Sequence, residues 1–194
     1  MNAMLKSLAA VAVVGVAALP VATTAQEIHA KCDGFQVVSS QSTGGSATFR
    51  AKVDRVNKTI EYVLNYTNLE GDIIQSHIHF SRPGSNGGIV LFLCTNAGNT
   101  PASATPAPLC PGTREGTVTG TLHAGDVVYI PFGNQFPPPP AGTQGISPGD
   151  FDAVVRFIDA GAGYVVVHTK AQPTGELRGQ IPDRDDHDHD GNQH

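Results

Sequence analysis

Charged residues and long apolar runs are both scarce in this chain. Only 15% of the 194 residues are charged, and no cluster of Lys and Arg occurs. A protein without such a cluster lacks the usual surface for nucleic acid or for an anionic membrane. The longest apolar run, Leu8 to Leu19, has 12 residues, whereas a membrane-spanning helix needs ~20. We therefore expect neither a nucleic-acid partner nor a transmembrane segment.

The short motifs of common enzyme classes are also missing. The sequence has no Gly-x-Ser-x-Gly, no His-Glu-x-x-His and no phosphate-binding loop that leads into a helix. The glycines from Gly84 to Gly88 lie between two expected strands, where they serve a turn. Carboxylates such as Glu61, Glu70 and Glu115 are scattered, and nothing places two of them on facing strands. These absences favour a non-enzymatic protein.

The amino terminus has the features of a secretory signal peptide. Lys6 precedes the apolar run, and Thr23 and Ala25 fit the −3 and −1 positions of a cleavage site. An uncleaved anchor is the alternative, but the run is short for that role. Cleavage after Ala25 would remove 25 of 194 residues and leave 169, with 11 of the 12 basic residues against 17 acidic ones. We expect a mildly acidic, secreted or extracytoplasmic protein.

Export has two consequences for side-chain chemistry. In an oxidising compartment, we expect Cys94 and Cys110 to pair across a loop rich in Pro, Ala, Asn and Thr. A pairing that uses Cys32 is the alternative; otherwise Cys32 is a free thiol near the mature amino terminus. Asn57 and Asn65 match the glycosylation pattern, which counts only in a eukaryote.

Turn-forming residues and short alternating segments predict the fold. The chain has 22 Gly and 14 Pro, and several segments alternate apolar and polar residues as half-buried strands do. We predict an all-β domain, an antiparallel β-sandwich or flattened barrel with one short helix. The expected strands are Phe35–Ser40, Ala47–Val53, Ile60–Tyr66, Ile73–Phe80, Ile89–Cys94, Thr117–Leu122, Val127–Ile130, Tyr164–Thr169 and Glu176–Ile181.

The one helix is predicted from residue 151 to 158. Apolar residues recur there at helical spacing, Asp150 or Ser147 can cap the start, and Gly161 can end it. The preceding segment, 135–145, holds four consecutive prolines, and we expect it to be an extended surface loop.

The chain divides into four parts on these grounds. We expect a signal peptide at 1–25, an amino-terminal segment at 26–34, a β-domain at 35–182 and a disordered tail at 183–194. The tail is rich in Asp and His, so loose binding of divalent ions is its alternative role.

Three histidines form the best candidate for a chemical site. Because successive strand residues point to opposite faces, His77 and His79 share one face of their strand, and two imidazoles at this spacing can meet one zinc or copper ion. His168 lies near the end of another strand. If the last strand folds back beside it, His168, Glu176 and Arg178 emerge on one polar side. We expect the two groups to be neighbours in space.

Two explanations of this group stay open. In the first, His77, His79 and His168 bind copper or zinc, with Glu176 supporting the ligands. In the second, the histidines and Arg178 form a structural hydrogen-bond network with Glu176 and backbone carbonyls. The His-x-His strand is also similar to copper–zinc superoxide dismutase, but no histidine occurs between residues 80 and 122. The ligands of a second metal therefore have no counterparts; His123 could add one ligand but is expected to be an exposed loop residue.

The chain resembles the chordin-type (CHRD) domain family from residue 35 to residue 181. The resemblance is carried by His77-Ile-His79, Asn86-Gly-Gly88, and Val167-His-Thr169 with Gly175-Glu-Leu-Arg-Gly-Gln180. It implies an extracellular β-domain without an established reaction. The chain holds a single copy and not chordin's tandem array, so chordin's partners do not carry over.

The sequence leaves two candidate functions. The first is a non-enzymatic extracellular binding or structural module with an unknown extracellular partner. The second is a metal-binding protein that uses copper or zinc at His77, His79 and His168 and could be redox-active.

Overall fold

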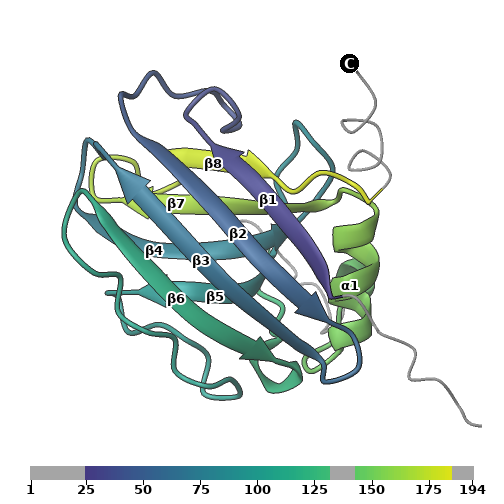
Figure 1. Ribbon diagram of the computed structural model, residues 1–194. Coiled ribbons are helices and arrows are strands. Elements are labelled where there is room, and N and C mark those ends of the chain that lie inside the picture. Colours follow the sequence, from purple (N-terminus) through teal and green to yellow (C-terminus); the bar gives the residue numbers. More distant parts are fainter. Residues whose placement is uncertain (1–24, 132–142, 185–194) are drawn as a thin grey trace, which may run out of the picture.

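The computed structural model describes residues 25–131 and 143–184. Two antiparallel four-stranded sheets face each other, with strand orders β1-β2-β3-β6 and β5-β4-β7-β8 (Figure 1). The prediction of an all-β sandwich with one short helix is confirmed, and neither sheet closes into a barrel. The expected signal peptide, the four prolines and the tail from residue 185 onward lie outside the described residues. The elements are β1 (Gln26–Cys32), β2 (Ser46–Asp54), β3 (Thr59–Thr67), β4 (Ile73–Phe80), β5 (Ile89–Thr95), β6 (Gly116–His123), α1 (Phe151–Asp159), β7 (Gly163–Thr169) and β8 (Leu177–Gln180), with 3-10 turns at Ala124–Asp126 and Thr143–Gly145.

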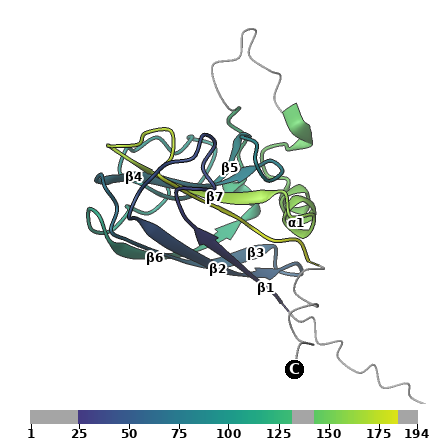
Figure 2. The same ribbon diagram turned by 90° about the horizontal axis from the view of Figure 1, so that it is seen from above.

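The helix α1 lies at one end of the two layers (Figure 2). Its start is fixed by Asp150, whose side chain accepts a hydrogen bond from the backbone N–H of Ala153 at 2.9 Å. Such a cap satisfies one of the free N–H groups of the first turn. The helix ends before Gly161, which has a positive φ of 62°. Both signals were readable in the sequence.

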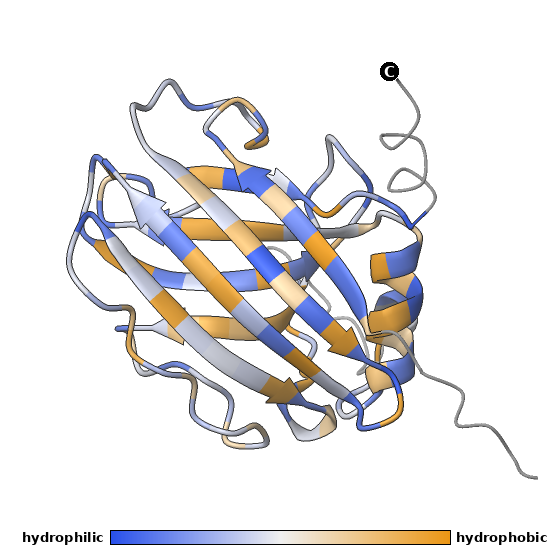
Figure 3. Ribbon diagram, viewed as in Figure 1, coloured by the Kyte–Doolittle hydropathy of each residue, from blue (hydrophilic) through white to orange (hydrophobic). Residues whose placement is uncertain are grey.

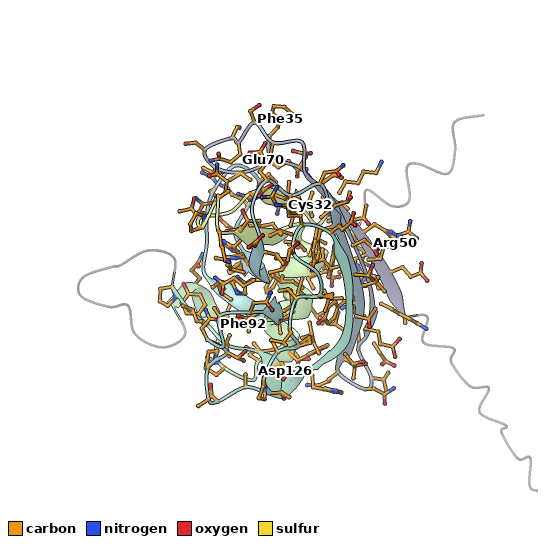
Figure 4. All side chains as sticks on the ribbon, turned by 90° about the vertical axis from the view of Figure 1, so that its left-hand side faces the viewer. Cys32, Phe35, Arg50, Glu70, Phe92 and Asp126 are labelled. Atoms are coloured by element: carbon orange, nitrogen blue, oxygen red, sulfur yellow. A yellow bond between two sulfur atoms is a disulfide. The ribbon has the colours of Figure 1, made fainter. Side chains whose placement is uncertain are left out.

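The first sheet is half-buried, as its alternating sequence predicts. On β2, Phe49 is fully buried while Arg50 is exposed, and β1 and β3 repeat the pattern. Figure 3 shows the resulting alternation of hydrophobic and hydrophilic residues along these strands. Arg50 lies on the outer face of this sheet (Figure 4). The inner side chains pack against those of the second sheet to form the core.

The second sheet is buried on both of its faces. Every residue of β7 is buried, although one face of that strand points away from the core. Loops cover this outer face. The backbone N–H of Thr95 bonds to the carbonyl oxygen of Pro108 at 2.9 Å, and Ile89 forms an isolated bridge with Ile130. The histidines of β4 and β7 consequently sit under loops and not in solvent.

Two of the expected strands are wrong. Residues 35–40 form a turn, because the Asp33 side chain accepts a hydrogen bond from the backbone N–H of Gln36 and the Val37 N–H bonds to the Gly34 carbonyl. Such local bonds compete with strand pairing. The edge strand is instead β1, within the segment that we placed before the domain. Residues 127–130 form no strand, although Ile130 makes an isolated bridge with Ile89 and the N–H of Val128 bonds to the carbonyl oxygen of Val90.

The expected disulfide is present. Cys94 and Cys110 are joined, with their Cα atoms 5.0 Å apart. Cys32 is a free, buried thiol, and burial raises its pKa to about 12. Among the described residues, no helix combines the length and apolar character needed to cross a membrane.

Candidate metal centre

The strand pairing brings the three histidines together. In the register of β4 and β7, Gln75 lies opposite His168 and His77 lies opposite Val166. His77, His79 and His168 therefore share the outer face of the second sheet. Their ring centroids are 5.2 Å apart for His77 and His168, 5.6 Å for His77 and His79, and 6.0 Å for His79 and His168.

One nitrogen from each ring lies close to a nitrogen of the other two rings. These three atoms lie within 4.8 Å of one another, and all three residues are buried. An ion bound at Zn–N distances of ~2.0–2.1 Å would need nitrogen separations of roughly 3.4 Å. The longest of these separations would have to shorten by up to about 1.4 Å, a movement of the size that small changes in side-chain torsions give.

Two backbone carbonyls fix the tautomers of two of these rings. The Nδ1–H of His79 donates to the carbonyl oxygen of Gly87 at 3.1 Å, and the Nδ1–H of His168 donates to that of Pro173 at 3.0 Å. A carbonyl oxygen can only accept, so Nδ1 must carry the proton in each ring. Each Nε2 then presents a lone pair. This is the usual orientation of a metal-ligating histidine, whose other ring nitrogen bonds to a carbonyl or carboxylate.

Among the described residues, these nitrogens have no hydrogen-bond partner. Nε2 of His79, Nε2 of His168 and both nitrogens of His77 are buried without a hydrogen bond. Buried polar atoms are normally paired, and each unpaired group costs about 1–3 kcal/mol. A metal ion is one species that could accept the lone pairs of three adjacent imidazoles.

Burial keeps these imidazoles neutral. Desolvation, and next the neighbouring His168, lowers the pKa of His79 to about 3. Desolvation lowers the pKa of His168 to about 4, and it lowers the pKa of His77 well below its ordinary value, with the other two histidines adding to the effect. Only a neutral imidazole can ligate a metal, so all three are in the ligating form at neutral pH.

Aromatic rings surround the histidines. Phe92 packs edge-on against His77 with centroids 4.4 Å apart, and Tyr164 stacks on His79 at 5.0 Å. The guanidinium of Arg178 lies 3.7 Å from the centre of the Tyr164 ring, a cation–π distance. By strand order, Tyr164 on β7 stands between His79 on β4 and Arg178 on β8.

Glu176 is not beside the histidines, contrary to the expected placement. Its carboxylate accepts hydrogen bonds from the hydroxyls of Thr43 and Thr169 and from the backbone N–H of Glu70, at 2.7–2.8 Å. The alternation that grouped it with Arg178 does not apply, because β8 begins only at Leu177. Glu176 thus ties two loops to the end of β7 and makes no described hydrogen bond to a site histidine.

A cavity of about 230 Å³ adjoins two of the histidines. His79 and His168 form part of its wall, and the remaining side chains in the wall are uncharged. They belong to Asn86, Ile89, Ile130, Pro131, Tyr164, Val166, Pro173 and Thr174, with Gly87 completing the wall. No acidic side chain belongs to the described wall of this cavity.

Two contributors were missed at the level of the sequence. Gly87 was noted as part of a glycine turn and of the Asn86-Gly-Gly88 motif but not as part of the site, although its carbonyl orients His79 and its N–H donates to the hydroxyl of Tyr164 at 2.8 Å. The Pro173 carbonyl carries no sequence signal at all. His123 is exposed at the end of β6 in the other sheet, so it does not join the three histidines.

Comparison with known proteins gives one family and no individual relative. The family model for the CHRD domain matches residues 28–181. This range runs from β1 to the residue after β8 and includes all three histidines. No curated protein matches the chain, and no solved structure matches it.

Proposed function

Because the chain belongs to the CHRD domain family, we propose that it is an exported, non-enzymatic CHRD module that binds one copper or zinc ion through His77, His79 and His168. One observation carries the proposal: three buried imidazoles offer nitrogens within 4.8 Å of one another, and none of these nitrogens has a hydrogen-bond partner in the described part of the chain.

The structural-network explanation is supported less well. It needs the histidine nitrogens to be paired with Glu176, Arg178 or backbone groups. Glu176 bonds to two threonines and a backbone N–H instead, and Arg178 donates to uncharged acceptors on other residues. A hydrogen-bond network that leaves the histidine nitrogens unpaired would destabilise the fold and not stabilise it.

Export is supported by the signal-like amino terminus and by the disulfide between Cys94 and Cys110. Disulfides persist in oxidising compartments and are rare in the cytosol. A secreted or extracytoplasmic module would bind its ion outside the cytosol, and an unidentified extracellular partner could exchange it. Mass spectrometry of the protein recovered from its native host should find Gln26 at the amino terminus; a chain that retains residues 1–25 would argue against export by cleavage.

Metal stoichiometry tests the binding proposal. The metal-free protein would be equilibrated with copper or zinc and its metal content measured by mass spectrometry. The same measurement on His79→Phe/His168→Phe should give one equivalent less. The difference in metal content is the informative quantity, because any metal bound by the Asp- and His-rich tail is the same in both proteins. His29→Phe/His123→Phe, which changes two exposed histidines of the first sheet, is the matched control. Equal stoichiometry in all three proteins would refute the proposed site.

A further inference from the structure

We propose that the site of His77, His79 and His168 selects monovalent copper over divalent zinc or copper. This inference rests on the proposed function, since it names the ion and the oxidation state for that same site. It follows from the charge of the ligands, the burial of the site, the cation beside it and the number of donors.

The ligand set carries no negative charge. The hydrogen bonds to the Gly87 and Pro173 carbonyls make His79 and His168 neutral Nε2 donors. Within the described part of the chain, no Asp, Glu or Cys belongs to the group, and Glu176 is engaged elsewhere. The segment 132–142 contains no Asp, Glu, Cys or His in its sequence. The described residues would therefore leave a bound ion its full formal charge.

Burial makes that charge decisive. His77 is fully buried, and His79 and His168 are 6% and 8% exposed. The desolvation cost of an ion in a low-dielectric site rises with the square of its charge, so a divalent ion costs about four times as much as a monovalent one. The walls offer aromatic rings and a cavity without charged side chains, so nothing there offsets the second charge.

Arg178 adds to the discrimination. Its guanidinium stands beyond Tyr164 and donates to the carbonyl oxygens of Ser85 and Arg82 and to the side-chain oxygen of Gln180. All three acceptors are uncharged, and no salt bridge to Arg178 occurs in the described ranges. Its charge is thus not neutralised locally, and it repels a divalent ion twice as strongly as a monovalent one.

The number of donors points the same way. Three imidazole nitrogens suffice for a monovalent d¹⁰ ion, which accepts low coordination numbers. Zinc takes four ligands, so that a three-histidine zinc site needs a water in the fourth position, and divalent copper prefers tetragonal sites. The described residues supply three donors.

The test uses the full wild-type chain without metal. Under anaerobic conditions, Cu(I) is supplied with bicinchoninate as competing chelator, and Zn(II) is added in up to hundredfold excess. We expect one equivalent of Cu(I) that the zinc does not displace. Displacement by zinc, or tighter binding of Cu(II) than of Cu(I), would overturn the inference while leaving the proposed function intact. If neither metal binds at one equivalent through the histidines, the proposed function fails as well.

A charge variant provides the second measurement. Arg178→Met removes a unit charge roughly 10 Å from the site, and at an effective dielectric of about 20 the ratio of Cu(II) to Cu(I) affinity should rise about tenfold. Arg50→Met removes the same charge from the outer face of the other sheet (Figure 4) and should leave the ratio unchanged. An Arg178→Met protein that binds one equivalent of Cu(I) with an unchanged ratio would contradict the role of Arg178.

Discussion

The Nδ1–H of His79 and the hydroxyl of Tyr164 both hydrogen-bond to the backbone of one residue, Gly87. The Nδ1–H of His79 donates to the carbonyl oxygen of Gly87 at 3.1 Å, and the N–H of Gly87 donates to the hydroxyl of Tyr164 at 2.8 Å. One glycine in the turn after β4 therefore sets the tautomer of a candidate ligand and holds the ring that stacks upon it. Groups of this kind control metal affinity although they do not touch the ion.

Gly87→Ala should weaken metal binding by about 10–100-fold. A Cβ at this position would lie 1.8 Å from the carbonyl oxygen of Phe80, so the turn must move and the Gly87 carbonyl moves with it. Gly44→Ala is the matched control because nothing lies within 4 Å of the added Cβ. Isothermal titration of copper into both variants checks the effect. Equal affinities would show that Gly87 does not orient His79.

The stability of the metal-free protein should fall as the pH is lowered from about 6.5 toward 4. The folded-state pKa of His168 is lowered to about 4, whereas an unfolded histidine titrates near ~6.5. The unfolded state thus binds more protons in this window, and each such histidine removes up to about 1.4 kcal/mol per pH unit. Above about pH 6.5 His168 is neutral in both states, and its contribution to the folding stability is fully present.

The measurement for this prediction is urea unfolding at several pH values. His168→Gln should reduce the slope between pH 6 and 4.5 by about one proton relative to the wild type. His123→Gln, at an exposed position, should keep the wild-type slope. Carboxylates also titrate near the lower end of this range, but they are common to all three proteins. The prediction is wrong if the two variants have the same slope.

Glu176 should matter for folding and not for metal binding. Glu176→Ala would leave the hydroxyls of Thr43 and Thr169 and the N–H of Glu70 without their acceptor, at a cost of about 3 kcal/mol or more. Glu61→Ala, at an exposed position of β3, should stay within about 0.5 kcal/mol of the wild type. Denaturant unfolding gives the stabilities. A Glu176→Ala protein that is as stable as the wild type, or that loses metal while folded, would refute this assignment.

The cysteines should react in a defined order. Native protein should resist alkylation because Cys32 is buried and its pKa is raised to about 12, while only the thiolate reacts. Unfolding without reductant should release one thiol, and reductant should release two more. Loss of the Cys94–Cys110 bridge should lower the unfolding free energy by about 3 kcal/mol in the chain-entropy model. Alkylation of native protein at Cys94 or Cys110 would contradict the pairing.

The sequence predicted the parts of the fold that local patterns control. Alternation located β2 and β3, the spacing from residue 151 located the helix, and the loop composition located the disulfide. It failed at residues 35–40, where the Asp33 side chain forms a turn, and at β1. The sequence of β1 does alternate, with Ile28 and Ala30 buried, but it was overlooked because it directly follows the expected cleavage site.

Only the local part of the site could be predicted from the sequence. The period of a strand places His77 and His79 on one face, and this is a local property. Their meeting with His168 depends on the register between β4 and β7, which distant side chains and a bulge determine. The burial of the face and the carbonyl partners come from loops, and loops leave little periodic signal.

A crystal structure of the copper-loaded protein, with anomalous data at the copper edge, tests the central claim most directly. We predict a single strong peak at ~2.0–2.1 Å from Nε2 of His79, Nε2 of His168 and one nitrogen of His77, the distances of imidazole ligation. Stoichiometric copper that gives no peak between these three rings, or a peak only at the histidines of residues 187–194, would contradict it.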